Sequence, residues 1–140
     1  MTTLTRILAP VDGSESALRA LHVADALAQQ SAAVLDIVTV VDLRSLDLYE
    51  QVGLTDEQIA SLEARVRETI LEPARASTSS KGRTARLLKG PIEATLLDEA
   101  RAASLVVVGR SGKGALERLL EGSVSRRLVS SSPAPVMIVP

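Results

Sequence analysis

Four residues in the last third of the chain have the types and the spacing of an anion-binding loop. They follow the apolar run Leu105–Val108 in the order Gly-x2-Gly-x9-Gly-Ser, as Gly109, Gly112, Gly122 and Ser123. Glycine lets a backbone approach a ligand closely and adopt positive φ. A helix start adds unpaired N–H groups and the positive end of the helix dipole. This combination after a strand is typical of phosphate binding.

The predicted phosphate cradle has three parts: Gly109, Gly112 and the backbone of the segment Gly122, Ser123, Val124 and Ser125. The hydroxyls of Ser123 and Ser125 would add two hydrogen bonds, and Ser123 is the expected N-cap of a helix. A second interpretation stays open. The same residues can be turn glycines and a helix cap without a ligand. On the local pattern alone, this ligand-free interpretation has about half the weight, because short glycine motifs often match by chance.

Two better-known phosphate motifs do not fit this stretch. A Walker A loop has a glycine five residues before its Gly-Lys pair and Ser or Thr after it, but those positions hold Val107 and Gly114. The dinucleotide fingerprint would need a third glycine where Glu117 stands. The chain therefore has no signature for P-loop chemistry or for NAD binding.

Asp12 is a second candidate, because it follows the apolar segment Thr5–Val11, which predicts a strand. In an open α/β sheet, ligands bind at the carboxyl ends of the strands, so Asp12 would contact the base, the ribose or a bound Mg²⁺ of a nucleotide. The alternative is an Asp-Gly turn in which Asp12 accepts a hydrogen bond from its own backbone. The residues alone favour the turn by about two to one.

Basic residues near the predicted cradle would offset the charge of a triphosphate. The alternative is a solvated charged surface, which we expect for Arg118 and for at least one of Arg126 and Arg127. The complete set is Arg110, Lys113, Arg118, Arg126 and Arg127.

A catalytic apparatus is not evident in the sequence. No Ser-His-Asp set and no pair of catalytic carboxylates stands out. The chain has no cysteine and one histidine, His22, so a Cys-based zinc site is excluded. We expect His22 on a helix surface without chemistry.

Composition restricts the class of protein further. A length of 140 residues indicates a single domain over residues 1–140. Tyr49 is the one aromatic residue and the net charge is −1, so we expect no nucleic-acid partner. No apolar run has the length of a membrane span or the flanks of a signal peptide. We therefore expect no membrane insertion and a cytoplasmic location.

Apolar and helical patterns alternate along the chain, which predicts an α/β fold with a parallel sheet. Ser14, Thr55 and Pro91 mark helix starts, with Pro91 at the first helical position, and Pro73 should kink or end the second helix. The segment Asp42–Leu54 is expected to be a loop or lid. The predicted strands are Thr5–Val11, Val34–Val41, Thr84–Lys89, Leu105–Val108 and Pro135–Val139. The charges of the third strand suggest a sheet edge or exposed faces.

The glycine-serine spacing resembles the pattern that marks the ATP-binding members of the universal stress protein family. The segment Ile7–Ser14 resembles the opening strand and turn of that family, and Ser132–Val139 resembles its closing strand. The similarity covers essentially the whole chain in the expected order.

The resemblance implies a Rossmann-like, doubly wound open sheet of five parallel strands in the order 3-2-1-4-5, of the adenine nucleotide alpha hydrolase type, with helices on both faces. It places adenine near Val40 or Val41, the ribose near Asp12 and Gly109, and the phosphates on the glycine-serine segment, bridged by Mg²⁺ or Mn²⁺. It also implies a homodimer through Pro135–Val139, since an unpaired apolar edge would otherwise be exposed. The implied binding residues are Pro10, Val11, Asp12, Val40, Gly109, Arg110, Gly112, Gly122, Ser123, Val124 and Ser125.

The sequence thus predicts an ATP-binding module that acts in stress response, with an unidentified protein partner as a further option. A slow ATPase or self-phosphorylating enzyme, a cyclic-nucleotide binder and a nucleotide-free interaction protein remain alternatives. The intact glycines argue against the last, because a degenerate site would be free to replace them.

Overall fold

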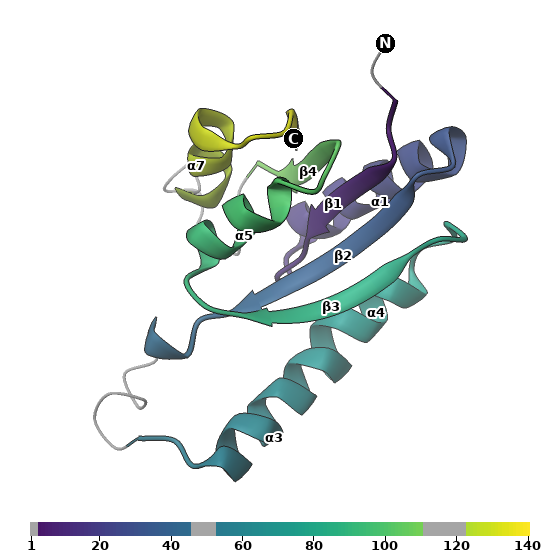
Figure 1. Cartoon of the computed structure of the whole chain (residues 1–140). Helices are drawn as coiled ribbons and strands as arrows, with labels where there is room; N and C mark the ends of the chain where they lie inside the picture. Colours follow the sequence, from purple (N-terminus) through teal and green to yellow (C-terminus); the bar gives the residue numbers. More distant parts are fainter. Residues whose placement is uncertain (1–2, 46–52, 111–122) are drawn as a thin grey trace.

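The computed structural model describes residues 3–45, 53–110 and 123–140. Within these ranges the strands form a parallel five-stranded sheet in the order β3-β2-β1-β4-β5 (Figure 1). The predicted fold class and strand order are confirmed. The strands are β1 (Arg6–Pro10), β2 (Val34–Val41), β3 (Thr84–Lys89), β4 (Leu105–Gly109) and β5 (Val136–Val139).

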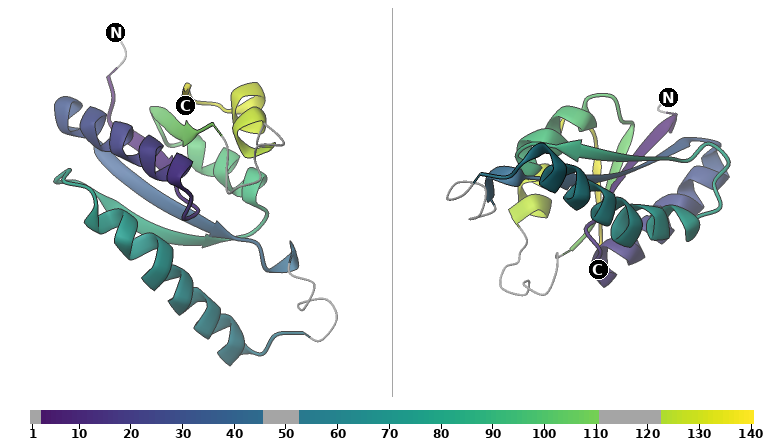
Figure 2. Two further views of the ribbon diagram at one scale, coloured as in Figure 1. Left: turned by 180° about the vertical axis from the view of Figure 1, so that it is seen from behind. Right: turned by 90° about the horizontal axis from the view of Figure 1, so that it is seen from below.

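Helices cover both faces of the sheet, as a doubly wound fold requires. In the left view of Figure 2, α1 lies in front of the sheet and α5 behind it. The core divides in the same way. Ile7 and Ala9 of β1 pack with α1, whereas Leu8 between them packs with α5 and α7, because successive strand residues point to opposite faces. The helical elements are α1 (Glu15–Ser31), η1 (Leu43–Ser45), α3 (Asp56–Val66), η2 (Arg67–Leu71), α4 (Glu72–Ala76), α5 (Ile92–Ala100) and α7 (Ser123–Ser131).

Helix α1 begins beside the end of β1 and sets the geometry of that corner. The Ser14 hydroxyl accepts a hydrogen bond from the Ala17 N–H at 3.1 Å and so caps the helix. The buried face of α1 carries Ala20, Ala24 and Ala28. Small side chains on this face let the helix axis lie close to the sheet.

The expected interruption at Pro73 takes an unexpected form. Helical backbone continues from Asp56 to Ala76, and the segment just before the proline, η2, is a π-helix. There the Glu72 N–H donates to the Arg67 carbonyl, five residues back. Proline lacks an N–H and its ring clashes with a preceding carbonyl in a regular helix. The wider π turn accommodates that ring without ending the helix.

Element boundaries differ slightly from those predicted. Pro91 is the N-cap of α5 and not its first helical residue. Helix α7 begins at Ser123, so Ser123 belongs to the helix and does not precede it as a cap. The final strand starts at Val136 and not at Pro135. Among the described residues, no helix is both long and apolar enough to cross a bilayer.

Candidate functional site

The carboxyl ends of β1 and β4 meet where the order of strands reverses. The chain leaves β1 towards β2 on one side, while β4 lies on the other side. The β1–β2 ladder continues to Pro10 opposite Val38, whereas the β1–β4 ladder extends only as far as Leu8 opposite Val106. In open α/β sheets this switch point is the usual place for a ligand.

The turn from Asp12 to Ser14 forms one side of the candidate site. Asp12 is exposed, and its Oδ1 accepts a hydrogen bond from the Ser14 N–H at 2.9 Å. Gly13 has a φ of +88°, which side chains rarely adopt. The Asp-Gly turn is therefore present. An ionised carboxylate has about four acceptor positions, so this hydrogen bond does not prevent Asp12 from contacting a ligand.

Gly109 ends β4 on the other side, and its lack of a side chain has a structural cause. A Cβ atom at this position would lie 2.6 Å from the carbonyl oxygen of Ser16 in α1. Backbone atoms cannot yield as a flexible side chain would, so α1 packs on β4 only because residue 109 is glycine. The presence of Gly109 is thus explained without a ligand.

Arg110 and Ser125 bring the end of β4 and the start of α7 together. The Ser125 hydroxyl donates to the Arg110 carbonyl at 3.3 Å. The Arg110 N–H donates to the Val139 carbonyl of β5 at 3.0 Å. Next to Ser125, Val124 is half-buried and packs against the core under α5 and α7. The first turn of α7 is therefore seated at the carboxyl edge of the sheet.

Two apolar residues of the predicted site, Val11 and Val40, contribute mainly to the core. Val11 is buried among the residues under α1, and its N–H donates to the Val38 carbonyl at 2.8 Å. Val40 is half-buried and packs on the α5 face. Pro10 ends β1 and is half-buried. The Val41 carbonyl accepts a hydrogen bond from the Gly90 N–H at 3.1 Å, so part of the backbone after β2 is already paired.

The remaining predicted site residues are placed only in part. Arg126 and Arg127 are exposed on α7, and the backbone of Ser123 opens that helix. Outside the described residues lie Gly112, Lys113, Arg118 and Gly122.

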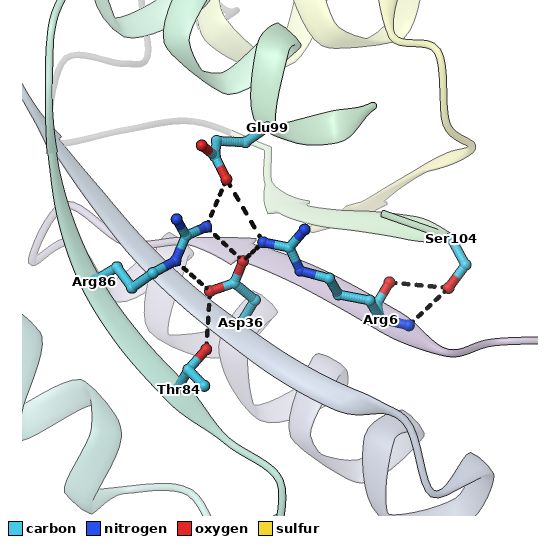
Figure 3. Close-up of polar contacts among 6 residues, drawn as sticks. All are labelled: Arg6, Asp36, Thr84, Arg86, Glu99 and Ser104. Carbon is cyan, nitrogen blue, oxygen red and sulfur yellow. Dashed lines mark hydrogen bonds and ion pairs between the residues drawn. The ribbon is translucent and has the colours of Figure 1, made fainter. Parts of the chain in front are cut away.

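Sequence reasoning missed a cluster of charged side chains in the amino halves of the strands (Figure 3). Asp36 of β2 is 1% exposed, and both its oxygens accept hydrogen bonds from Arg86 of β3, at 3.1 and 2.7 Å. Arg6 of β1 also binds Asp36, and Thr84 donates to it at 3.0 Å. Glu99 of α5 lies 2.5 Å from Arg86 and 3.5 Å from Arg6.

The charges of this cluster are balanced by its own members. Burial raises the pKa of Asp36, but the hydrogen bonds from Arg86, Arg6 and Thr84 outweigh it and lower the pKa below its ordinary value. The hydrogen bond to Asp36 raises the pKa of Arg86. Two basic side chains face two acidic ones, which joins β1, β2, β3 and α5. A single aspartate within the apolar run VLDIVTVV was the available signal.

A second buried carboxylate holds α1 to the turn before β3. Asp25 accepts hydrogen bonds from the Ser80 hydroxyl at 2.5 Å and from the Ser80 and Ser79 N–H groups at 2.9 and 3.0 Å. Burial raises the pKa of Asp25, but these hydrogen bonds, with one from Gln29, lower it overall. Its role is structural. Among the described residues, no group of three His, Cys, Asp or Glu side chains could hold a metal ion.

The sheet order and the helices on both faces define an open, doubly wound α/β protein with a Rossmann-like fold. The sequence model of the universal stress protein family matches residues 3–140. A protein from Staphylococcus haemolyticus named for the same family is 32% identical over 145 residues, with 99% of this chain and 86% of that protein covered. The chain therefore belongs to the universal stress protein family.

Solved structures agree with this assignment. The universal stress protein UspA from Lactobacillus plantarum has a TM-score of 0.77 at 26% identity, with both chains covered completely. A universal stress protein in complex with cAMP has a TM-score of 0.66 at 26% identity, with 99% of this chain and 98% of that chain covered. The hypothetical protein MJ0577 shares the fold, with a TM-score of 0.80 at 23% identity over 99% of this chain and 96% of its own.

Proposed function

We propose that this chain binds an adenine nucleotide, with ATP as the first candidate, at the carboxyl ends of β1 and β4, and that it acts as a nucleotide-dependent regulatory module in stress response. The observation that carries the proposal is the seating of the start of α7 on the end of β4, through Ser125 and Arg110. A helix start aimed at a switch point provides N–H groups and a positive dipole end for phosphate.

In the proposed binding mode, different elements bind different parts of the nucleotide. Asp12 offers its exposed carboxylate to the ribose, beside Gly109. Adenine lies towards the backbone after β2, near Val40. The phosphates lie towards Gly112 and residues 122–125, with the exposed side chain of Arg110 nearby. Mg²⁺ or Mn²⁺ would enter with the phosphates, whose oxygens suit such ions.

A cyclic nucleotide is the second candidate ligand, because a related universal stress protein at 26% identity is in complex with cAMP. The two ligands make different demands. The triphosphate of ATP needs hydrogen-bond donors from the whole glycine-serine segment, whereas the single cyclic phosphate of cAMP needs fewer hydrogen-bond donors. Competition between ATP and cAMP for a fluorescent adenine nucleotide separates them, since the physiological class should displace the probe at the lower concentration.

The experiment that tests the proposal is extraction of retained ligand from the purified protein, with mass spectrometry, followed by calorimetric titration with ATP. Gly122→Val should abolish binding while circular dichroism stays unchanged, because a β-branched side chain blocks close approach of the phosphates. The control is Gly82→Ala, at a glycine remote from the site where a Cβ atom has ordinary contact with Val34 at 3.6 Å. Unchanged ATP affinity in Gly122→Val would refute the placement.

We also propose a homodimer through β5, which is the edge strand beside β4. The Val106 and Arg110 N–H groups donate to the carbonyls of Pro135 and Val139, so the alternation along a parallel strand directs the backbone groups of Val136 and Ile138 outwards. An antiparallel pair centred on Met137 places Val136 of one copy opposite Ile138 of the other and pairs all these outward groups.

Exposed apolar side chains occur on β5 and on two helices that contact it, α1 and α7, and support a second copy as the occupant of this edge. Met137 of β5 is 37% exposed, Leu18 of α1 is 40% exposed and Val129 of α7 is 62% exposed. A second copy would cover the strand edge and so remove an aggregation hazard. The proposed location of the module is the cytoplasm, which cell fractionation tests.

A further inference from the structure

The backbone of Arg110 connects the candidate nucleotide site to the free edge of the sheet. Its carbonyl accepts the hydrogen bond from Ser125 at the start of α7, at 3.3 Å. Its N–H donates to the carbonyl of Val139, the last residue of β5, at 3.0 Å. One residue is therefore in direct contact with the predicted phosphate-binding helix and with the predicted dimer strand.

Helix α1 makes a second connection between the same two regions. It starts at the Asp12–Ser14 turn, and Ser16 packs against Gly109, which pairs with Val139 in the sheet. One turn further on, the Arg19 Nε donates to the carbonyl of Pro140 at 3.2 Å. The end of β5 is thus held by the end of β4 and by α1, and both of these elements begin or end at the candidate site.

We infer that nucleotide binding and self-association are coupled, so that nucleotide at the site strengthens dimerisation through β5 and dimerisation strengthens nucleotide binding. The inference rests on the proposed function. Strand β5 has four residues, and its outward groups pair well only while its end is held against β4. A nucleotide that contacts Ser125 and Arg110 orders the residue that holds Val139. Each event therefore orders a segment that the other also needs ordered.

Linkage makes the effect reciprocal, and couplings of this kind are commonly 5- to 150-fold. We expect saturating ATP to lower the dimer dissociation constant by about 10-fold, measured by sedimentation velocity across a protein dilution series. Because each dimer carries two sites, the ATP affinity per site should rise by the square root of that factor, about 3-fold, between protein concentrations far below and far above that constant. Exchange of the Arg110 amide hydrogen should slow with either event.

Two pairs of variants locate the coupling. Met137→Glu brings two like charges together at the proposed two-fold axis and should give a monomer with the ATP affinity of the dilute wild type, whereas Met137→Gln should still dimerise. Arg19→Ala should reduce the coupling factor and leave the ATP affinity of the monomer unchanged. Its control is Arg75→Ala, an exposed arginine on α4, which packs against β3 at the other edge of the sheet.

The outcomes separate this inference from the proposed function. ATP binding with the same dimer constant in its presence and absence overturns the coupling and leaves the function standing. A chain that stays monomeric at every concentration, with ATP bound, overturns the coupling as well. Absence of ATP binding in both monomer and dimer overturns the proposed function and the coupling together.

Discussion

In the amino halves of the strands, Asp36 is enclosed by Arg6, Arg86 and Thr84, whereas at the carboxyl ends Asp12 is exposed and accepts a hydrogen bond from its own turn. Both aspartates belong to or follow a strand of the same sheet. Their partners decide their roles. A carboxylate neutralised by built-in cations stabilises the fold, while one left at an open sheet edge remains available to a ligand.

The largest expected effect comes from breaking the enclosed cluster. Asp36→Asn leaves Arg6 and Arg86 with less negative charge, and loss of one partner in a buried ion pair costs about 3–5 kcal/mol. Since Arg86 is 38% exposed, we expect the lower end, about 3 kcal/mol in the free energy of unfolding by urea. ATP affinity should not change.

The control for Asp36→Asn is Asp98→Asn, which removes an ion pair with Arg101 between side chains that are both 77% exposed. It should change the unfolding free energy by less than about 1 kcal/mol. Equal losses in the two variants would contradict the distinction between the enclosed cluster and ordinary surface charge.

Gly109→Ala tests whether the glycine at the carboxyl end serves packing. The added Cβ meets the Ser16 carbonyl oxygen at 2.6 Å, and such overpacking costs about 1–3 kcal/mol. Differential scanning calorimetry without nucleotide should show a lowered Tm. Gly82→Ala, with its nearest contact at 3.6 Å, should leave Tm nearly unchanged. An unchanged Tm in Gly109→Ala would show that packing does not require glycine at residue 109. Ligand binding would then be the remaining explanation for this glycine.

The dependence of stability on pH sharpens the comparison further. The pKa values of Asp36 and Asp25 are lowered in the folded protein. A lowered pKa contributes stability that is complete above the ordinary value of about 3.9 and is lost as pH falls through the folded value. These two carboxyl groups should therefore cause no change in the free energy of unfolding near neutral pH and should lower it below about pH 4. Asp36→Asn should show a shallower fall.

The smallest effect belongs to the open end. Ser125→Ala removes one hydroxyl from the proposed cradle, and a hydrogen bond of this kind contributes about 0.5–1.5 kcal/mol, or roughly 2- to 10-fold in ATP affinity by calorimetry. Ser130→Ala on the same helix, whose hydroxyl donates to the Arg127 carbonyl, is the matched control. Equal affinities for the two variants would place the phosphates away from Ser125.

Sequence patterns predicted the regular elements well where burial dictates them. Val34–Val41 and Thr84–Lys89 are strands with the predicted bounds, because apolar and β-branched runs suit a pleated, buried surface. The order of the strands followed from the resemblance to the family. It placed Asp12 and Gly109 at the same sheet edge, as the structure does.

Long-range contacts could not be predicted in the same way. In the sequence, Arg6, Asp36 and Arg86 are charged residues within predicted strands. Only the pairing register of β1, β2 and β3 brings them together. Gly109 read as a ligand glycine because Ser16, its neighbour in space, is distant in sequence. Its presence therefore does not argue for nucleotide binding, and of the motif glycines only Gly112 and Gly122 still support that proposal.

The π-helical segment Arg67–Leu71 sets the rotation of α3 about the helix axis relative to α4. A regular α-helix advances about 100° per residue, so the one extra residue in this wide turn rotates α3 by about that angle relative to α4. With α3 in this orientation, Glu63 lies 3.0 Å from Lys89 at the end of β3. Deleting the exposed residue Thr69 would remove the extra residue, turn Glu63 away from Lys89 and bring the Pro73 ring against a carbonyl of the preceding turn.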